Sequence, residues 1–471
     1  MLLDANTVRT MLGMLQGPRI SDDAWVHEVK VSETEEGIDV TVSVGTEEKP
    51  NVPIAEAKQD VFTRLGARPD AVVRVSMDQP STRRIAARTV EVPGYGWCPF
   101  EPAALAHPVE AAEDGAIALS NGLVRVEVDA ADGTFSLGGV AGYGRLVDGG
   151  DLGDSYNYSP PRQDSFVAAP VAVTLGLIER GPVRARVRIT STYEWPDHVD
   201  GSSQARVGSH RVDVETDLEL RADDPVVRVT TSFVNPSGDH RLRVHLPLPE
   251  PVAESHAESA FAVVTRGLTA EGRPDEFGLP TAPAHRFVTA GRLTVAHEGV
   301  CEYELVDIEA GAGGDSARTL ALTVLRSTGM LSRLGMAYRP FPAGPMTPVE
   351  GLQMRGKRVT LRYALELDCA DPYALADDVL LPLESVASLG GGTRPAAGSA
   401  LTVEGAVVSA LHRVRGSLEL RVFNPSAGPA TVSLPGRAGW LVDLRGYPQE
   451  PFEGTFSLRP FGIASARLRD G

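Results

Sequence analysis

The sequence predicts an all-β protein. Short stretches in which apolar and polar residues alternate recur along most of the chain, and this period of two is typical of strands that bury one face. Gly, Asp, Asn and Pro residues separate these stretches at close spacing, as they do in hairpin turns. The periodicity of an amphipathic helix is found only near the N-terminus, over residues 4–16 and 54–66. Two large packed sheets are therefore expected in the main domain.

Composition indicates a globular protein of ordinary type. The chain has 471 residues, of which 42% are hydrophobic and 23% are charged, and its length suits two to four domains of roughly 150 residues each. Asp and Glu outnumber Lys and Arg by 62 to 45, which gives a formal net charge of −17. An acidic surface disfavours nucleic acids and anionic membranes as partners.

Cysteine usage and the N-terminal residues bear on location. Cys98, Cys301 and Cys369 lack paired spacing, so neither a disulfide framework nor a cysteine-based zinc site is expected. The opening residues lack the basic and apolar segments of a signal peptide, and no stretch of the sequence is long and apolar enough for a membrane span. We therefore expect a cytoplasmic protein with no membrane partner.

The first part of the sequence divides into a helical segment, residues 1–20, and a small domain, residues 21–105. The predicted helix over 4–16 carries one apolar stripe and ends before a Gly-Pro pair. Because so short a helix is marginal alone, it needs a partner surface. The small domain shows strand alternation around a short helix over 54–66 that Gly66 closes. We predict a small β-sandwich here.

The remainder is predicted to contain a large β domain, residues 106–371, a linker, residues 372–400, and a smaller β-sandwich, residues 401–471. The linker prediction rests on a Gly-rich segment, LGGGTRPAAGS. The expected strands of the two domains are 123–128, 171–177, 183–190, 211–220, 226–234, 401–408, 418–423, 430–434 and 463–468.

One loop, DGGDLGDSYNYSPP over residues 148–161, has the features of a binding site. Asp151 and Asp154 are turn formers, and carboxylates so close on a tight loop are predicted to cap backbone N–H groups rather than act as an acid and base pair. Tyr156 and Tyr158 are two residues apart, so both rings point to one face of an extended segment. A tyrosine offers a ring for stacking and a hydroxyl for hydrogen bonding, which suits a sugar. The alternative is that both rings only pack the loop.

Further motifs follow this loop in order: Tyr193-Glu194-Trp195-Pro196, Asn235, Asp239-His240-Arg241-Leu242-Arg243-Val244, Leu325-Arg326-Ser327, Gly344-Pro345, Gln353-x-x-Gly356 and Leu458-Arg459-Pro460-Phe461. Together with the loop, they resemble the C-terminal β-rich half of the zinc-dependent α-mannosidases, glycoside hydrolase family 38. The resemblance covers the chain from near Val92 to its C-terminus.

The resemblance implies a fold and a set of site residues. The large domain is expected to be a supersandwich of the galactose-mutarotase type, flanked by smaller β-sandwich domains. Tyr156 matches a tyrosine that reaches from the β half of these enzymes into the sugar pocket of their barrel, and Tyr158 matches a position that is aromatic in the family. Asp154 completes the substrate-binding residues expected in this chain.

The resemblance also implies what lies elsewhere. In the family, the nucleophile and the zinc ligands belong to an N-terminal α/β barrel, and this sequence has no run of alternating strands and helices that would form one. A retaining glycosidase needs a nucleophilic carboxylate and an acid carboxylate across the scissile bond. No catalytic residue, metal ligand or cofactor is therefore assigned to this chain, and zinc is expected in the missing barrel.

Two histidine constellations offer other chemistry. His198-Val199-Asp200 resembles the H-x-D zinc pair of the barrel, but it lies in a polar segment and supplies only two of the three or four ligands that zinc needs. A histidine acid with a carboxylate base would suit an aldose epimerase. The candidates are His210, His240 or His245 with Glu302 or Glu304. For the segment over residues 239–245, which contains His240 and His245, the preferred interpretation is a solvated strand edge with ion pairs.

The main functional hypothesis is the non-barrel half of an α-mannosidase-like glycoside hydrolase. It would support the catalytic domain, lend the tyrosine loop to the mannose site, and lack activity alone. Its partners would be a mannose-containing carbohydrate and the missing N-terminal barrel domain or its gene product. The alternatives are a free-standing carbohydrate-binding protein and, less favoured, an aldose epimerase-like enzyme. The apolar face of residues 4–16 separates the first two, because it is buried on a partner in one case and on this chain in the other.

Overall fold

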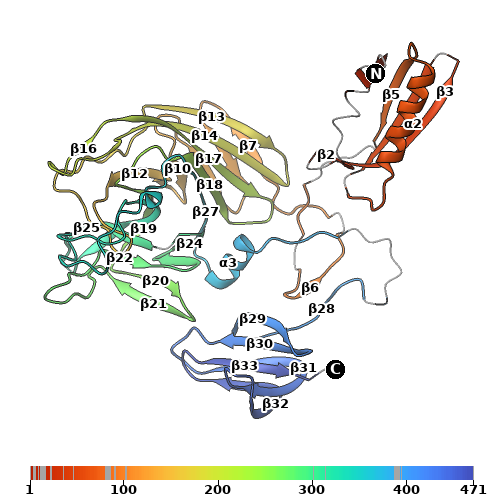
Figure 1. Ribbon diagram of the computed structural model, residues 1–471. Coiled ribbons are helices and arrows are strands. Elements are labelled where there is room, and N and C mark those ends of the chain that lie inside the picture. The colour runs from red at the N-terminus through yellow and green to blue at the C-terminus, as the bar shows by residue number, and fades with distance from the viewer. Residues whose placement is uncertain are drawn as a thin grey trace. The chain divides into compact units, whose positions relative to one another are not determined.

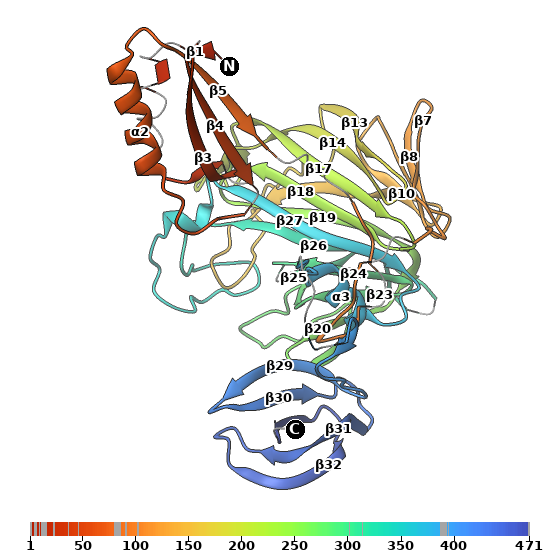
Figure 2. The same ribbon diagram turned by 90° about the vertical axis from the view of Figure 1, so that its right-hand side faces the viewer.

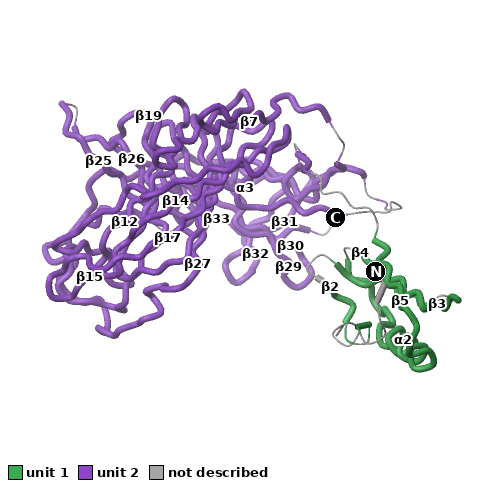
Figure 3. The backbone as a smooth tube through the Cα atoms, turned by 90° about the horizontal axis from the view of Figure 1, so that it is seen from above, with its two compact units in different colours: residues 1–85 green, residues 86–471 purple. Residues whose placement is uncertain are grey.

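The structure is a computed structural model, and the chain divides into two compact units, Met1–Ile85 and Ala86–Gly471 (Figure 3). Strands dominate both units (Figure 1), so the all-β prediction is confirmed. None of the described helices is long and apolar enough to cross a membrane. The structure describes residues 2–3, 7–8, 10, 17–21, 24–35, 37–45, 47–79, 86–89, 92–100, 103–300, 302–312, 314–386, 393 and 395–469.

The first unit is one sheet with a helix on it, with strand order β1-β5-β4-β3-β2. Helix α2 confirms the predicted helix at 54–66, and its buried Val61 and Leu65 pack with Ile38 and Val40 of the sheet. Val8, from the predicted helix over 4–16, is buried in the same cluster, whereas most of that helix lies outside the described residues. The elements are β1 Leu2–Leu3, β2 Arg19–Ser21, β3 Ala24–Thr34, β4 Gly37–Gly45, α2 Ile54–Ala67 and β5 Val72–Asp78.

This unit differs from the small β-sandwich expected over 21–105. Strands β4 and β5 pair in parallel, and parallel neighbours need a crossover connection, which α2 supplies. The apolar side of the helix then covers the sheet in place of a second sheet. The unit also ends at residue 85 rather than 105.

Three sheets build the large β domain, with strand orders β11-β10-β9-β8-β7, β12-β19-β26-β25-β22 and β13-β14-β17-β18-β27-β24-β23-β20-β21. The strands are β7 Glu110–Glu113, β8 Ile117–Ser120, β9 Arg125–Val128, β10 Phe135–Leu137, β11 Val140–Tyr143, β12 Arg145–Gly150, β13 Ala172–Arg180, β14 Arg184–Trp195, β17 His210–Arg221, β18 Val227–Val234, β19 His240–Val252, β20 Glu254–Ser259, β21 Ala262–Gly267, β22 Thr281–Pro283, β23 Phe287–Ala290, β24 Leu293–Glu298, β25 Glu302–Glu309, β26 Ser316–Ser327 and β27 Arg358–Leu367. Two short strands, β15 His198–Val199 and β16 Arg206–Val207, pair separately, and a 3-10 turn, η1, covers Glu350–Gln353.

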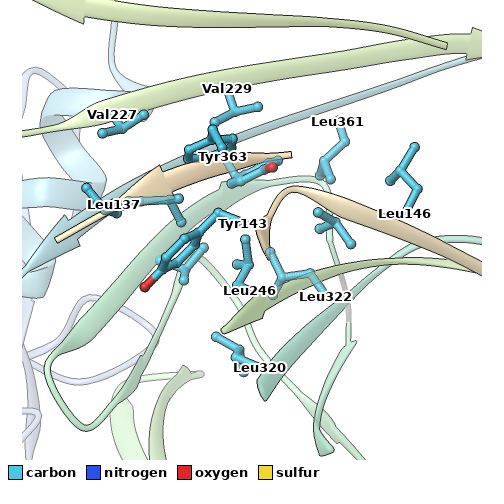
Figure 4. Packing of buried hydrophobic residues seen from close by; sticks show 14 of the residues in the cluster. Leu137, Tyr143, Leu146, Val227, Val229, Leu246, Leu320, Leu322, Leu361 and Tyr363 are labelled. Atoms are coloured by element: carbon cyan, nitrogen blue, oxygen red, sulfur yellow. The ribbon is translucent and has the colours of Figure 1, made fainter. Parts of the chain in front are cut away.

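The core of this domain lies between the sheets (Figure 4). Strand β14 alternates between buried and partly exposed residues along nearly its whole length, as the period-two pattern predicts. In β19, Leu242, Val244 and Leu246 point into the core. Leu320 and Leu322 of β26 join them from the same sheet, and the nine-stranded sheet supplies its own apolar residues from the opposite side. The labelled residues from β18 and β27 are Val227, Val229, Leu361 and Tyr363.

The expected solvated strand edge around His240 is wrong. Strand β19 lies between β12 and β26 rather than at an edge, so His240 is fully buried and Arg241 is only 4% exposed. The expected ion pairs are present, because Arg241 and Arg243 both donate to Glu304, at 2.8 and 2.9 Å. Burial of these charges follows from the neighbouring strands on both sides, which the pattern of one strand does not reveal.

The C-terminal part of the chain forms a separate sheet and core. Helix α3, Pro372–Leu380, occupies the start of the expected linker, and Leu375 and Ala376 bury against Phe287. The five-stranded sheet has the order β29-β30-β33-β31-β32 and encloses its own apolar cluster. Phe423 of this sheet contacts Phe261 of the large domain, with ring centroids 5.4 Å apart. The strands are β29 Val407–Val414, β30 Ser417–Phe423, β31 Ala430–Val442, β32 Pro448–Leu458 and β33 Ile463–Leu468, and a short pair joins β6 Gly96–Trp97 to β28 Gly398–Ser399.

Candidate functional site

Two loops follow neighbouring strand ends of the sheet β12-β19-β26-β25-β22 and pack on each other (Figure 2). The tyrosine loop, residues 151–161, follows β12, and the facing loop, residues 328–349, follows β26. Both strands run antiparallel to β19, which separates them, so they are parallel to each other and their C-terminal ends meet at one edge. Gly150 and Ser327, the last residues of the two strands, pair with the same residue, His240.

Asp154 is the point at which the two loops join. Its side chain is fully buried. One carboxylate oxygen accepts the N–H groups of Tyr156 and Asn157, each at 3.0 Å, and the other accepts the N–H of Arg333 at 2.9 Å and the guanidinium of Arg339. Burial alone would raise the pKa of this carboxyl, but the backbone N–H groups and Arg339 hold that pKa below its usual value.

Asp151 has the same function at the base of the tyrosine loop. Its carboxylate accepts the N–H groups of Gly153 and Ser159, at 2.8 and 3.2 Å, and pairs with the Arg326 guanidinium at 2.8 Å. The same guanidinium donates to the Asn157 carbonyl oxygen at 2.8 Å. The prediction that both carboxylates cap backbone N–H groups is confirmed.

A buried polar network supports the strands beneath the loops. His240 lies between Asp148 and Asn235, with its Nδ1 2.6 Å from the Asp148 carboxylate and its Nε2 3.0 Å from the Asn235 amide oxygen. Asp148 also pairs with Arg206, and both side chains are almost completely buried. These contacts join β12, β16 and β19 to the turn that follows β18.

A second group of contacts links η1 to the tyrosine loop. The Gln353 amide binds Asp239 twice, at the backbone N–H and at the carboxylate, with distances of 2.9 and 2.8 Å. The Asp239 carbonyl oxygen then accepts the N–H of Asp151 at 2.8 Å. Four of the sequence motifs that carry the family resemblance therefore converge with the tyrosine loop on one network.

The structure separates the three residues predicted to bind substrate. Tyr156 is 54% exposed, Tyr158 is 8% exposed and Asp154 is fully buried. The guanidinium of Arg241 covers the Tyr158 ring, 3.8 Å from its centroid, and burial raises the pKa of the Tyr158 hydroxyl to about 12. Of the three, only Tyr156 is available to a ligand in this structure.

The two rings do not share a face because the loop is not extended between them. Asp154 accepts N–H groups two and three residues ahead of it, which is the geometry of an Asx-type turn. After this turn Tyr156 is exposed, whereas Tyr158 is buried against the Arg241 guanidinium. The expectation that a spacing of two places both rings together is therefore wrong here.

The histidine constellations are held in other networks. The Asp197 carboxylate lies 2.9 and 2.8 Å from ring nitrogens of His198 and His210 and accepts a hydrogen bond from the Arg355 guanidinium at 2.6 Å. The hydrogen bonds from Arg355 and, to a smaller extent, His210 lower the pKa of the Asp197 carboxyl. Asp200 caps the turn after it through the N–H of Ser203. In the described part of the chain, no group of three His, Cys, Asp or Glu side chains has the arrangement of metal ligands.

The residues proposed for an epimerase do not assemble into an acid and base pair. His210 lies on the nine-stranded sheet and His240 is enclosed by Asp148 and Asn235. Burial lowers the pKa of His245 to about 4. Glu304 is held by two arginines, and Glu302 accepts the Thr323 hydroxyl at 2.9 Å.

The solved structures that are similar to this chain include two from Enterococcus faecalis. A protein of glycoside hydrolase family 38 from Enterococcus faecalis has 22% sequence identity and a TM-score of 0.59, and the match covers 79% of this chain and 45% of that one. An α-mannosidase from Enterococcus faecalis V583 has 18% identity and a TM-score of 0.61, and the match covers all of this chain and 53% of that one. This chain shares their fold. It spans about half the length of each. No protein-family profile and no curated protein matches the sequence.

The family 38 resemblance inferred from the motifs is thus confirmed at the level of the fold. Sequence reasoning missed Arg339 and Arg206, which hold Asp154 and Asp148. Each arginine lies far along the chain from its aspartate. The turn pattern that pointed to Asp154 carries no information on which cation pairs with it, and no role was predicted for Asp148.

Proposed function

We propose that this chain is the non-barrel half of an α-mannosidase-like glycoside hydrolase. In this proposal it supports a catalytic α/β barrel outside these 471 residues and lends Tyr156 to the mannose site. The carrying observation is the contrast within the tyrosine loop: Asp151, Asp154 and Tyr158 are buried and engaged, whereas Tyr156 projects from this rigid base with 54% of its surface exposed. A ring with a free hydroxyl suits stacking on a sugar and one hydrogen bond.

The surroundings of Tyr156 favour a docked partner. The facing loop exposes three large apolar side chains, Leu334 at 59%, Phe341 at 63% and Met346 at 56%. Arg339 donates to the Phe341 carbonyl oxygen at 2.5 Å, and the Ser332 hydroxyl accepts the N–H groups that follow at 343 and 344. Exposed apolar residues on an ordered loop are typical of an interaction surface. The barrel is the occupant that fits the proposal, because both structural neighbours are about twice as long as the match.

The division of chemistry follows from the residues present. The proposed site offers a hydroxyl and an aromatic ring from this chain, and both act by orienting the sugar. The nucleophile, the acid and the zinc would come from the barrel, together with the rest of the mannose pocket. A cytoplasmic location and the absence of nucleic-acid and membrane partners stay sequence-based predictions.

Complementation with the barrel tests this proposal. The chain and the product of a neighbouring reading frame that encodes an H-x-D-containing barrel are purified separately and together, and hydrolysis of an aryl α-mannoside is measured with and without a zinc chelator. We expect zinc-dependent turnover from the mixture and none from this chain. Zinc-dependent turnover by this chain alone, after contaminating enzymes have been removed, would contradict the proposal.

The alternative of a free-standing carbohydrate-binding protein shares the exposed Tyr156. It differs in expecting the chain alone to bind mannosides. Calorimetric titration with methyl α-mannoside separates the two: saturable binding by this chain that Tyr156→Ala abolishes favours the alternative, and binding that requires the barrel favours the proposal.

A further inference from the structure

The backbone and the ring of Tyr156 are held by different groups. Its backbone N–H donates to Asp154 at 3.0 Å, which fixes where the residue leaves the loop. Its ring lies against the guanidinium of Arg339, whose central carbon is 5.8 Å from the ring centroid. A half-exposed aromatic side chain with no such contact exchanges between rotamers on a fast timescale. The contact with Arg339 therefore favours one rotamer of the Tyr156 side chain.

The Arg339 guanidinium has a fixed position of its own. It is 7% exposed and donates from each of its nitrogens: Nε to the Asn157 amide oxygen at 2.9 Å, Nη1 to the Phe341 carbonyl oxygen at 2.5 Å and Nη2 to the Asp154 carboxylate. A planar fork that is bound at three points is rigid. The ring of Tyr156 thus meets a cation that does not move with it, and the face of an aromatic ring attracts such a cation.

The other end of the ring lies beside the backbone of the facing loop. A Cβ atom placed on Gly344 would be 3.5 Å from the Tyr156 hydroxyl oxygen, so the hydroxyl end of the ring lies close to this part of the facing loop. The ring of Tyr156 therefore has the Arg339 guanidinium near its face and residue 344 near its hydroxyl.

We propose that Arg339 is a positioning residue that selects the rotamer of Tyr156 and so presents its hydroxyl to the sugar. The identity of the sugar rests on the proposed function, whereas the selection of the rotamer does not. Asp154 then has two separate roles, since one oxygen holds the Tyr156 backbone and the other holds the arginine that orients the ring.

Arg326 offers a matched control. Its side chain is 17% exposed, and its guanidinium also anchors the tyrosine loop, through Asp151 and the Asn157 carbonyl oxygen. Arg339 contacts the ring of Tyr156. Among the described residues, Arg326 makes no cation–ring contact. Loss of either arginine loosens the loop, and only loss of Arg339 removes the contact with the ring.

Fluorine NMR of this chain, labelled with 3-fluorotyrosine, tests the proposal without any ligand. The chain has 10 tyrosines, and Tyr156→Phe identifies the resonance of Tyr156. We expect Arg339→Gln to move this resonance toward its unfolded-chain position and to sharpen it, while Tyr158 stays at its native shift. Arg326→Gln should leave the Tyr156 resonance nearer its native shift, and Arg339→Lys, which keeps a cation near the ring, should give an intermediate shift. An unchanged Tyr156 resonance in folded Arg339→Gln overturns the proposal.

A second variant covers the case in which Arg339→Gln fails to fold because Asp154 is left buried and unpaired. Asp154→Asn/Arg339→Gln removes both charges together, and the same displacement of the Tyr156 resonance is expected. If this folded double variant keeps the native resonance, the proposal is wrong.

Turnover with the barrel adds a functional readout. If Arg339 acts through Tyr156, Arg339→Gln should lower kcat in the native background and have little further effect in a Tyr156→Phe background. Equal losses in both backgrounds would show that Arg339 does not act through the tyrosine. Absence of turnover from every mixture would contradict the proposed function and leave the NMR result to decide the role of Arg339.

Discussion

Two sets of ion pairs between arginines and carboxylates in the large domain differ in burial. At the loop end, Asp148 with Arg206 and Asp154 with Arg339 have side chains that are at most 8% exposed. Elsewhere in the domain, Arg180 pairs with Glu113, and their side chains are 56% and 48% exposed. In the first set, Asp154 and Arg339 lie on loops that lack ladder hydrogen bonds, and Asp148 and Arg206 lie on the strands β12 and β16 beneath those loops. The second lies on strands that the ladder already holds, so it adds solubility more than order.

The comparison predicts its largest effect at Arg206. Arg206→Met removes the arginine that pairs with the buried Asp148 carboxylate, and breaking such a pair costs about 3–5 kcal/mol. The free energy of unfolding from urea denaturation measures this loss. Arg180→Met is the matched control, since the same change in an exposed pair should have little effect. Similar losses in both variants would remove the distinction between the two sets.

Buried histidines extend the contrast to groups without a charged partner. Burial lowers the pKa of His297 and of His245 to about 4 from an ordinary 6.5. The unfolded chain therefore binds more protons than the folded chain between these pH values, so stability falls as pH drops through that window, by about 3 kcal/mol for each histidine at most.

A variant without one of these histidines measures its share of the acid sensitivity. Both ring nitrogens of His297 lack hydrogen-bond partners among the described residues, so His297→Leu should fold and should flatten the dependence of the unfolding free energy on pH between 6.5 and 4. An unchanged slope would show that His297 is protonated in the folded state as readily as in the unfolded state.

A smaller and local effect is expected at Asp154. Asp154→Asn weakens the charge-assisted contacts to Arg339 and to the loop N–H groups, which amounts to about 2 kcal/mol in the free energy of local opening. Amide hydrogen exchange at Tyr156, Asn157 and Arg333 should then accelerate about thirtyfold, while amides in β14 keep their rates. Uniform acceleration throughout the domain would show that the tyrosine loop is not a separate unit of order.

The smallest effect is expected in the exposed pair itself. Replacing both partners, Arg180→Gln with Glu113→Gln, should change the free energy of unfolding by less than about 1 kcal/mol. The interaction energy from the double-mutant cycle should be equally small and should vanish in high salt. A coupling of several kcal/mol would place this pair with the buried set.

The sequence could predict features that depend on nearby residues, but not features that depend on distant strands. Most strand positions, the α2 helix and the capping roles of Asp151 and Asp154 depend on residues close together in the chain, and these expectations are confirmed. The strand expected over 401–408 is wrong, because β29 begins only at Val407. The burial of His240 depends on strands β12 and β26, which lie far from it in sequence. Sequence patterning of one strand carries no information on how many neighbours that strand has.

The candidate site divides in the same way. The exposed position of Tyr156 and the buried position of Tyr158 follow from the turn at Asp154 and from Arg241, which covers the second ring.

The crossover through α2 likewise turned an expected sandwich into a sheet with a helix, because alternation alone does not distinguish parallel from antiparallel pairing.

The central claim is that Tyr156, and not Tyr158, serves the sugar site. The most direct measurement compares kcat for an aryl α-mannoside in the Tyr156→Phe and Tyr158→Phe variants of this chain, each reunited with the barrel. Removing the exposed hydroxyl should cost on the order of 1 kcal/mol or more, which lowers kcat roughly fivefold or further, while Tyr158→Phe should be nearly silent. Equal activity in the two variants would contradict the claim.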